Sequence, residues 1–196
     1  MSPLVIVLIA IIAIALIAGV WLIIKARRTK ELRSRFGPEY QRAVRAEGDT
    51  STAEKVLHQR EQRVSRLKIS PLNEEQQSRF ADEWELEQAH FVDEPRAAVE
   101  AADRLVADVM RARGYPVSDF EQRVADISVD HPVVVENYRV AHNIAVRDSQ
   151  EPVSTEELRN AMLHYRALFA DLLHDGGKHP IRDVRPETSR LAKGAG

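Results

Sequence analysis

The chain has 196 residues, with 28 Lys or Arg, 30 Asp or Glu, no Cys, and 44% hydrophobic residues. The lack of cysteine excludes a disulfide scaffold, a thiolate nucleophile and a zinc-thiolate site. Without its apolar N-terminal run and its C-terminal tail, the chain keeps about 140 residues, which suffice for one hydrophobic core.

The small formal net charge of −2 hides a strong segregation of charge along the chain. Residues 25–45 hold eight Lys or Arg against two Glu, a net charge of +6. Residues 46–175 hold 15 Lys or Arg against 26 Asp or Glu, a net charge of −11, and residues 176–196 carry +3. An acidic body therefore lies between two basic arms.

The N-terminal run Leu4–Ile24 contains 21 residues and no charge. As a helix it would be about 31 Å long, which matches the hydrocarbon core of a bilayer. A cleaved secretory signal would need a basic start, a shorter apolar run and a small-residue cleavage site, and the chain has none of these. We expect residues 1–24 to form an uncleaved transmembrane anchor and residues 25–36 a basic stalk.

The flanks of this run predict its orientation. Basic residues follow the run at once and none precedes it, so the N-terminus should lie outside and the remaining chain in the cytoplasm. Trp21 would lie at the same interface. The expected membrane-interface residues are Trp21, Lys25, Arg27, Arg28 and Lys30. Two further interpretations stay open, a homodimer through the small pair Ala15 and Gly19 and binding of anionic lipid by the basic cluster.

Residues 37–175 read as an acidic, all-α domain of about six helices. Seven sequence features mark the expected helix boundaries: Gly37-Pro38 to Gly48, Ser51-x-x-Glu54, Pro71 to Asn73, Asp93-Glu94-Pro95 to Gly114, Ser118-x-x-Glu121, Asp130-His131-Pro132, and Ser154-x-x-Glu157 to Gly176-Gly177. Three of them have the capping-box pattern. No segment alternates with period two, so we predict no strands. The glycines fall at helix ends, in the apolar run or in the tail, which leaves none for a phosphate-binding loop.

Two acidic-x-x-His pairs are the candidate metal ligands, namely Glu87 with His90 and Asp171 with His174. Di-iron bundles use such pairs on two helices. About one such pair is expected by chance at this composition, and the two further inward carboxylates of a di-iron site cannot be assigned. The sequence offers no catalytic residue and implies no cofactor.

Two other features have both a functional and a structural interpretation. His142 has the chemistry of a general base, but its position beside an apolar stripe favours a histidine at the edge of the core. The loop from Arg113 to Val117 could contact a peptide or an anion, but Gly114 and Pro116 favour a helix cap covered by Tyr115.

Nucleic-acid binding is disfavoured because the folded part is acidic. The tail, residues 176–196, is basic and lacks aromatic residues, and we expect it to be a disordered tether.

Several stretches of the chain resemble a group of uncharacterised bacterial single-pass membrane proteins. The resemblance is carried by Arg35-Phe36-Gly37-Pro38-Glu39-Tyr40, by Arg113-Gly114-Tyr115-Pro116-Val117-Ser118-Asp119-Phe120-Glu121-Gln122-Arg123, and by the final helix. It implies a location in the bacterial plasma membrane and no known activity.

These observations favour a non-enzymatic scaffold, tethered to the membrane, that binds an unidentified protein partner. The alternatives are a helical-bundle enzyme or metal-binding protein that uses the acidic-x-x-His pairs, and a domain that senses anionic lipid.

Overall fold

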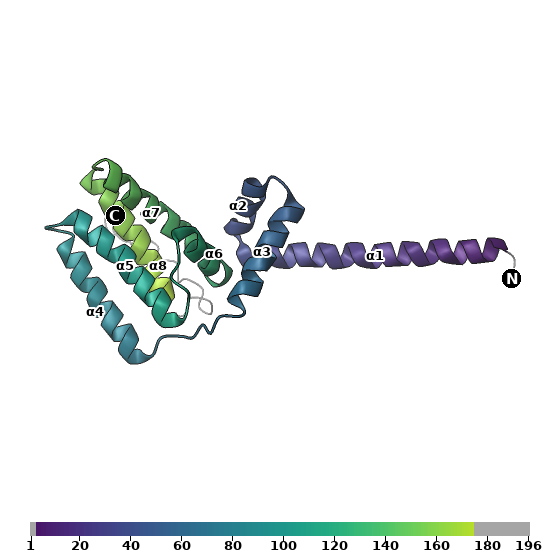
Figure 1. The fold of residues 1–196 in the computed structure, drawn as a ribbon, viewed down its shortest axis with the longest axis horizontal. Coiled ribbons are helices and arrows are strands. Elements are labelled where there is room, and N and C mark those ends of the chain that lie inside the picture. Colours follow the sequence, from purple (N-terminus) through teal and green to yellow (C-terminus); the bar gives the residue numbers. More distant parts are fainter. Residues whose placement is uncertain (1–2, 175–196) are drawn as a thin grey trace, which may run out of the picture.

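The long first helix dominates the shape of the molecule (Figure 1). The computed structural model describes the backbone of residues 3–174 and the side chains of residues 12–174. Helix α1 spans Pro3–Phe36 without a break, so the apolar run and the basic stalk belong to one rod. Gly37, at φ 48°, ends this helix, and Pro38 begins the next one directly. The chain therefore enters the body through a single-residue turn.

The rest of the described chain is also helical, which confirms the all-α prediction. Seven helices follow α1: α2 (Pro38–Glu47), α3 (Thr50–Val64), α4 (Glu74–His90), α5 (Pro95–Arg113), α6 (Phe120–Asp130), α7 (Val135–Gln150) and α8 (Thr155–Leu173). Residues 3–174 contain no strand. The sequence predicts about six helices after the N-terminal run, one fewer than the seven that follow α1 among the described residues.

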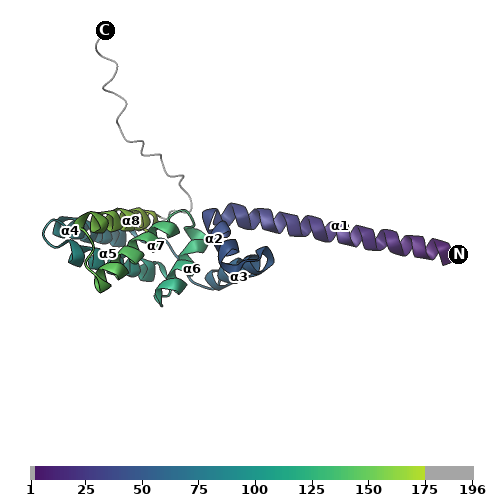
Figure 2. The same cartoon turned by 90° about the horizontal axis from the view of Figure 1, so that it is seen from above.

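The body has two hydrophobic cores. The larger core lies among α4 to α8 and includes Phe80, Trp84, Tyr138, Tyr165 and Phe169. The smaller core joins the end of α1 to α2, α3 and α6, through Phe36, Tyr40, Leu57 and Val129 among others. In Figures 1 and 2, α1 projects from the side of the body that holds the smaller core.

Several predicted helix ends are confirmed. Ser154 and Glu157 form the reciprocal bonds of a capping box at the start of α8. Gly48 and Gly114 take the left-handed conformation at the ends of α2 and α5. The predicted separation at Asn73 is also correct, and Asn73 caps α4 with Gln76 in a further capping box.

Two of the predicted caps are wrong by one or two residues. The side chain of Asp49, not Ser51, accepts the hydrogen bond that caps α3, and Asp119, not Ser118, caps α6. In both cases the carboxylate of a nearby aspartate takes the position, because Asp is as good an N-cap as Ser.

The predicted helix start at Asp130 to Pro132 is also wrong. Helix α6 continues to Asp130, and the amide of His131 still bonds the carbonyl of Ile127 at 2.8 Å. A turn follows, and α7 begins at Val135. The final helix ends at Leu173 with His174 as its C-cap, before Gly176-Gly177. Those glycines and the tail 176–196 lie outside the described residues.

The predicted membrane span is only partly covered by the structure. The side chains of Leu4–Ile11 lie outside the described residues. Among the residues that are described, none of the helices is both long enough and apolar enough to cross a bilayer.

Gly114→Ala should destabilise the protein far more than Gly48→Ala. Both glycines have positive φ, 98° and 69°, which costs an L-residue about 1–2 kcal/mol. A Cβ at Gly114 would also lie 2.4 Å from the carbonyl oxygen of Lys68, whereas at Gly48 it would meet no atom within 4 Å. Urea unfolding of the full chain in detergent micelles measures both variants. Equal losses would contradict the packing at Gly114.

Candidate functional site

The junction between α1 and the body is built from aromatic packing and ion pairs. Phe36 is completely buried, and the guanidinium of Arg33 lies 5.1 Å from the ring centre of Tyr40. Arg35 contacts Glu61 of α3 at 3.2 Å and Asp130 at the end of α6 at 3.8 Å. Three elements distant in sequence therefore meet at the last turn of α1.

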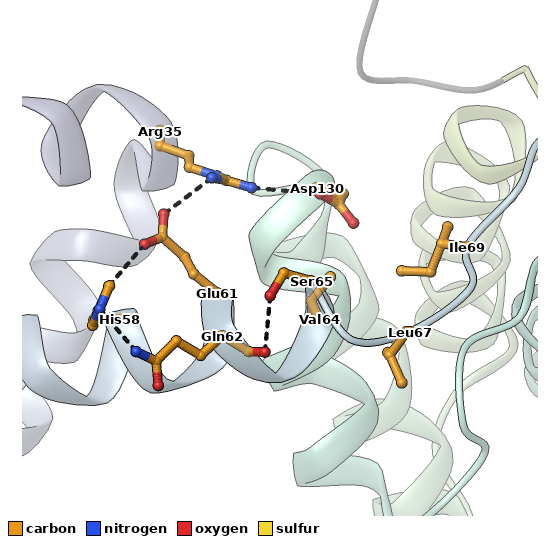
Figure 3. A pocket seen from close by; sticks show the side chains of 9 residues that line it. All are labelled: Arg35, His58, Glu61, Gln62, Val64, Ser65, Leu67, Ile69 and Asp130. Atoms are coloured by element: carbon orange, nitrogen blue, oxygen red, sulfur yellow. Dashed lines mark hydrogen bonds and ion pairs between the residues drawn. The ribbon is translucent and has the colours of Figure 1, made fainter.

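A pocket of about 390 Å³ opens beside this junction (Figure 3). Arg35 lies at its upper edge and reaches towards both Glu61 and Asp130. His58 contacts Glu61 at 3.4 Å and the side chain of Gln62 at 3.1 Å. The polar groups at this edge are thus already paired with one another, as expected of a structural contact and not of a catalytic centre. We call the contacts that hold α1, α2 and α3 to the body the joint.

A buried carboxylate holds the N-terminal helices to the body. Glu39 of α2 is 3% exposed, and Arg139 of α7 donates two hydrogen bonds to it, both 2.7 Å long. Arg60 of α3 donates a third bond of 3.1 Å. The fork of an arginine facing a carboxylate is the strongest geometry for such a pair. Burial penalises the charged form of Arg139, but the pairing with Glu39 outweighs it and raises the pKa of Arg139.

A second buried carboxylate, Asp126 of α6, adds to the same joint. Arg63 of α3 donates a bond of 2.9 Å to Asp126, and Gln122 donates another of the same length. The Gln122 bond lies within α6, whereas the Arg63 bond links α3 to α6. Arg60 of α3 also donates a hydrogen bond of 3.3 Å to the hydroxyl of Ser128 on α6, so two arginines of α3 hold it to the body.

A separate polar cluster lies where α5, α6, α7 and α8 converge. The hydroxyl of Tyr165 donates a hydrogen bond of 3.0 Å to Asp103. His142 lies 3.8 Å and Arg123 3.9 Å from the same carboxylate. The ring of His142 stacks on Phe120 at 3.6 Å, which supports its interpretation as a histidine at the edge of the core.

The ionisation of this cluster follows from its surroundings. Burial raises the pKa of Asp103, but the contacts with His142, Arg123 and Tyr165 outweigh it, so the pKa lies below the ordinary 3.8. Burial, reinforced by the charge of Asp103, raises the pKa of both Tyr138 and Tyr165 above the ordinary 10.0. The surroundings therefore favour the ionised carboxylate of Asp103 and the neutral hydroxyls of Tyr138 and Tyr165, which suits a structural role.

Removal of the hydroxyl should change the stability of the protein in opposite directions at the two tyrosines of this cluster. The hydroxyl of Tyr138 is buried and has no hydrogen-bond partner among the described residues, so Tyr138→Phe should stabilise the protein by about 1 kcal/mol. Tyr165→Phe removes a bond to a carboxylate and should cost about 2 kcal/mol. Chemical unfolding at neutral pH measures both. Equal losses in the two variants would contradict the arrangement.

The same tyrosines predict a loss of stability in alkali. A group whose pKa is raised by folding stabilises the folded state below its unfolded pKa, and this stability declines as the pH rises. The protein should therefore lose stability above pH 10.0, the ordinary pKa of tyrosine. Tyr138→Phe should flatten this decline. An unchanged pH profile in that variant would argue against ionisation of Tyr138 as a cause.

The structure keeps the two candidate metal pairs apart. Glu87 and His90 lie 3.5 Å apart near the start of α5, where the amide of Glu94 bonds the carbonyl of His90. Asp171 and His174 lie near the other end of α5, where Arg113 contacts α8. A helix of 19 residues is about 28 Å long, so the pairs cannot share an ion.

The second pair is also engaged elsewhere. Asp171 contacts Nδ1 of the buried His131 at 2.6 Å, and Nδ1 of His174 bonds the carbonyl of Ala170. Within the described residues, no three His, Asp or Glu side chains converge as metal ligands would.

The loop after α5 is confirmed as a helix cap. The amide of Tyr115 bonds the carbonyl of Met110 at 3.0 Å, and its side chain is buried. Arg113 is also buried and donates a bond of 2.7 Å to the carbonyl of Leu172. Both side chains that could have contacted a ligand therefore contact the protein itself.

The predicted interface residues all lie on exposed turns of α1. The ammonium of Lys25 lies 5.3 Å from the ring centre of Trp21, and Arg27, Arg28 and Lys30 point outward from the rod. Their contact with a membrane stays a prediction. The sequence analysis missed Glu39, Asp103 and Asp126, because their arginine and tyrosine partners lie far away in the chain.

Comparisons with protein-family models, with curated proteins and with solved structures gave no match.

Proposed function

We propose that this protein is a non-enzymatic interaction module, tethered to the bacterial plasma membrane by α1, with its helical body in the cytoplasm. The observation that carries the proposal is the distribution of exposed apolar side chains. Fourteen large hydrophobic side chains are exposed among residues 12–174, and nine of them belong to α1 between Ile12 and Ile24. Apolar surface of this extent on a soluble rod would be costly in water, and a bilayer removes the cost.

The charges beside the apolar stretch support the same arrangement. The basic residues 25–45 follow it directly, as the positive-inside rule expects of a cytoplasmic flank. Because α1 continues unbroken into the smaller core, the body is held at a fixed distance from the anchor.

The acidic charge of the body is concentrated on the side away from the anchor. Residues 74–94, which include α4, carry eight Asp or Glu against one Arg. Figures 1 and 2 both place α4 at the opposite end of the body from α1. An anionic leaflet repels such a surface, and a basic partner in the cytoplasm is attracted to it. We therefore propose a partner with a basic surface that contacts α4.

Crosslinking in intact cells tests the partner. Glu75, Asp82 and Glu85 are exposed and lie on one face of α4, at i, i+7 and i+10. Replacing all three with lysine should abolish the crosslinked species of the full chain. The matched control replaces three exposed acids elsewhere, Asp108, Glu121 and Glu151, and should keep the species. The proposal fails when repeated crosslinking recovers no partner. It also fails when both triple variants lose the crosslinked species to the same extent.

A further inference from the structure

We infer that the groove between α1 and α3 binds the head group of a phospholipid that carries both a phosphate and a primary ammonium, as phosphatidylethanolamine does. The inference rests on the proposed membrane tether, and it names a ligand and a site for the membrane-facing end of the body.

The groove has a suitable size and position. It has a volume of about 410 Å³, and residues of α1 and α3 line it. Arg28 lies one turn of helix beyond Ile24, about 6 Å along the axis. The head-group layer on each side of a bilayer is about 5–8 Å thick. Figures 1 and 2 show α3 lying beside the body end of α1.

Two cations in the groove are available to a phosphate. Arg28 of α1 and Lys55 of α3 line the groove, are exposed, and form no ion pair with another described residue. Ser51, in the first turn of α3, adds a hydroxyl group that can donate a hydrogen bond to the phosphate. These groups come from two helices and meet only because α3 packs beside the stalk.

The acidic residues of the groove explain why the ligand should also carry an ammonium. Glu54 accepts a hydrogen bond of 2.9 Å from Tyr40, and Glu61 contacts Arg35 at 3.2 Å. Glu31 also lines the groove but is exposed and pairs with no other described residue. A purely anionic head group would place its charge beside this carboxylate. A primary ammonium next to the phosphate would instead pair with Glu31 and donate hydrogen bonds to it.

The test uses the full chain in nanodiscs of phosphatidylcholine that contain equal small fractions of phosphatidylethanolamine and phosphatidylglycerol. Native mass spectrometry after mild detergent release counts the lipids that stay bound. We expect the ethanolamine lipid to be retained about tenfold more than the glycerol lipid. Arg28→Gln with Lys55→Gln should remove this retention, and Glu31→Gln should shift retention towards the glycerol lipid.

The controls separate this site from general charge and from free phosphate. Arg66→Gln with Lys68→Gln makes the same change in charge outside the groove, at two exposed positions, and should leave retention unchanged. Excess inorganic phosphate should not displace the lipid. Equal retention of the two lipids, equal losses in both double variants, or displacement by phosphate would each overturn the inference. Insertion into the nanodiscs without lipid preference defeats this inference alone, whereas failure to insert defeats the proposed tether.

Discussion

Glu39→Gln should destabilise the protein by about 3–5 kcal/mol, because it leaves two buried or half-buried arginines without their shared carboxylate. Arg139 and Arg60 both direct their guanidinium groups at Glu39, and Arg139 is itself buried. The loss should appear first as separation of α2 and α3 from the body. Urea unfolding, followed by circular dichroism of the full chain in micelles, measures it.

Glu136→Gln is the matched control for this prediction. Glu136 also accepts a bond from Arg139, of 3.3 Å, but its side chain is 56% exposed. Exposed pairs contribute about 0–1 kcal/mol, so this variant should remain close to the parent protein. The double variant Glu39→Met with Arg139→Met should be more stable than Glu39→Gln, because it removes the main charges together. A small effect of Glu39→Gln would contradict the buried joint.

Phe36→Ala should cost about 3–5 kcal/mol and should loosen the connection between α1 and the body. Phe36 is the last residue of α1, is completely buried, and belongs to the smaller core with Tyr40 and Leu57. Hydrogen exchange should show lost protection in α2 and α3, while α4 to α8 stay protected by their own core. Leu32→Ala, at a partly buried position on the same helix, should have a smaller effect. Uniform loss of protection would show that the two cores unfold as one.

Most of the helices could be predicted because their signals are local. The capping box of Ser154 and Glu157 and the glycine stop at Gly114 each depend on residues within a few positions of one another. The predicted caps of α3 and α6 were wrong because a second acceptable N-cap, Asp49 or Asp119, lies within two residues of the predicted serine. The helix start predicted at Asp130 was wrong because α6 continues through a sequence that resembles a helix start.

The joint and the polar cluster could not be predicted, because their partners are brought together only by tertiary packing. Glu39 and Arg139 are 100 residues apart, and Tyr165 and Asp103 are 62 apart. No periodicity in a single sequence connects such residues. The same reasoning explains the misleading acidic-x-x-His pairs, whose local spacing says nothing about whether two pairs meet.

The membrane tether is tested most directly by alkaline carbonate washing of bacterial membranes that contain the full chain. The wash removes peripheral proteins and leaves proteins that span the bilayer. We expect the full chain to stay in the membrane pellet. The triple variant Ile14→Arg, Ile17→Arg and Val20→Arg keeps the length of α1. Because insertion of each Arg at the centre of the bilayer costs about 2.5–3.5 kcal/mol, this variant should lose the anchor. We expect the variant protein in the supernatant after the wash. Release of the unaltered chain by the wash would contradict the account.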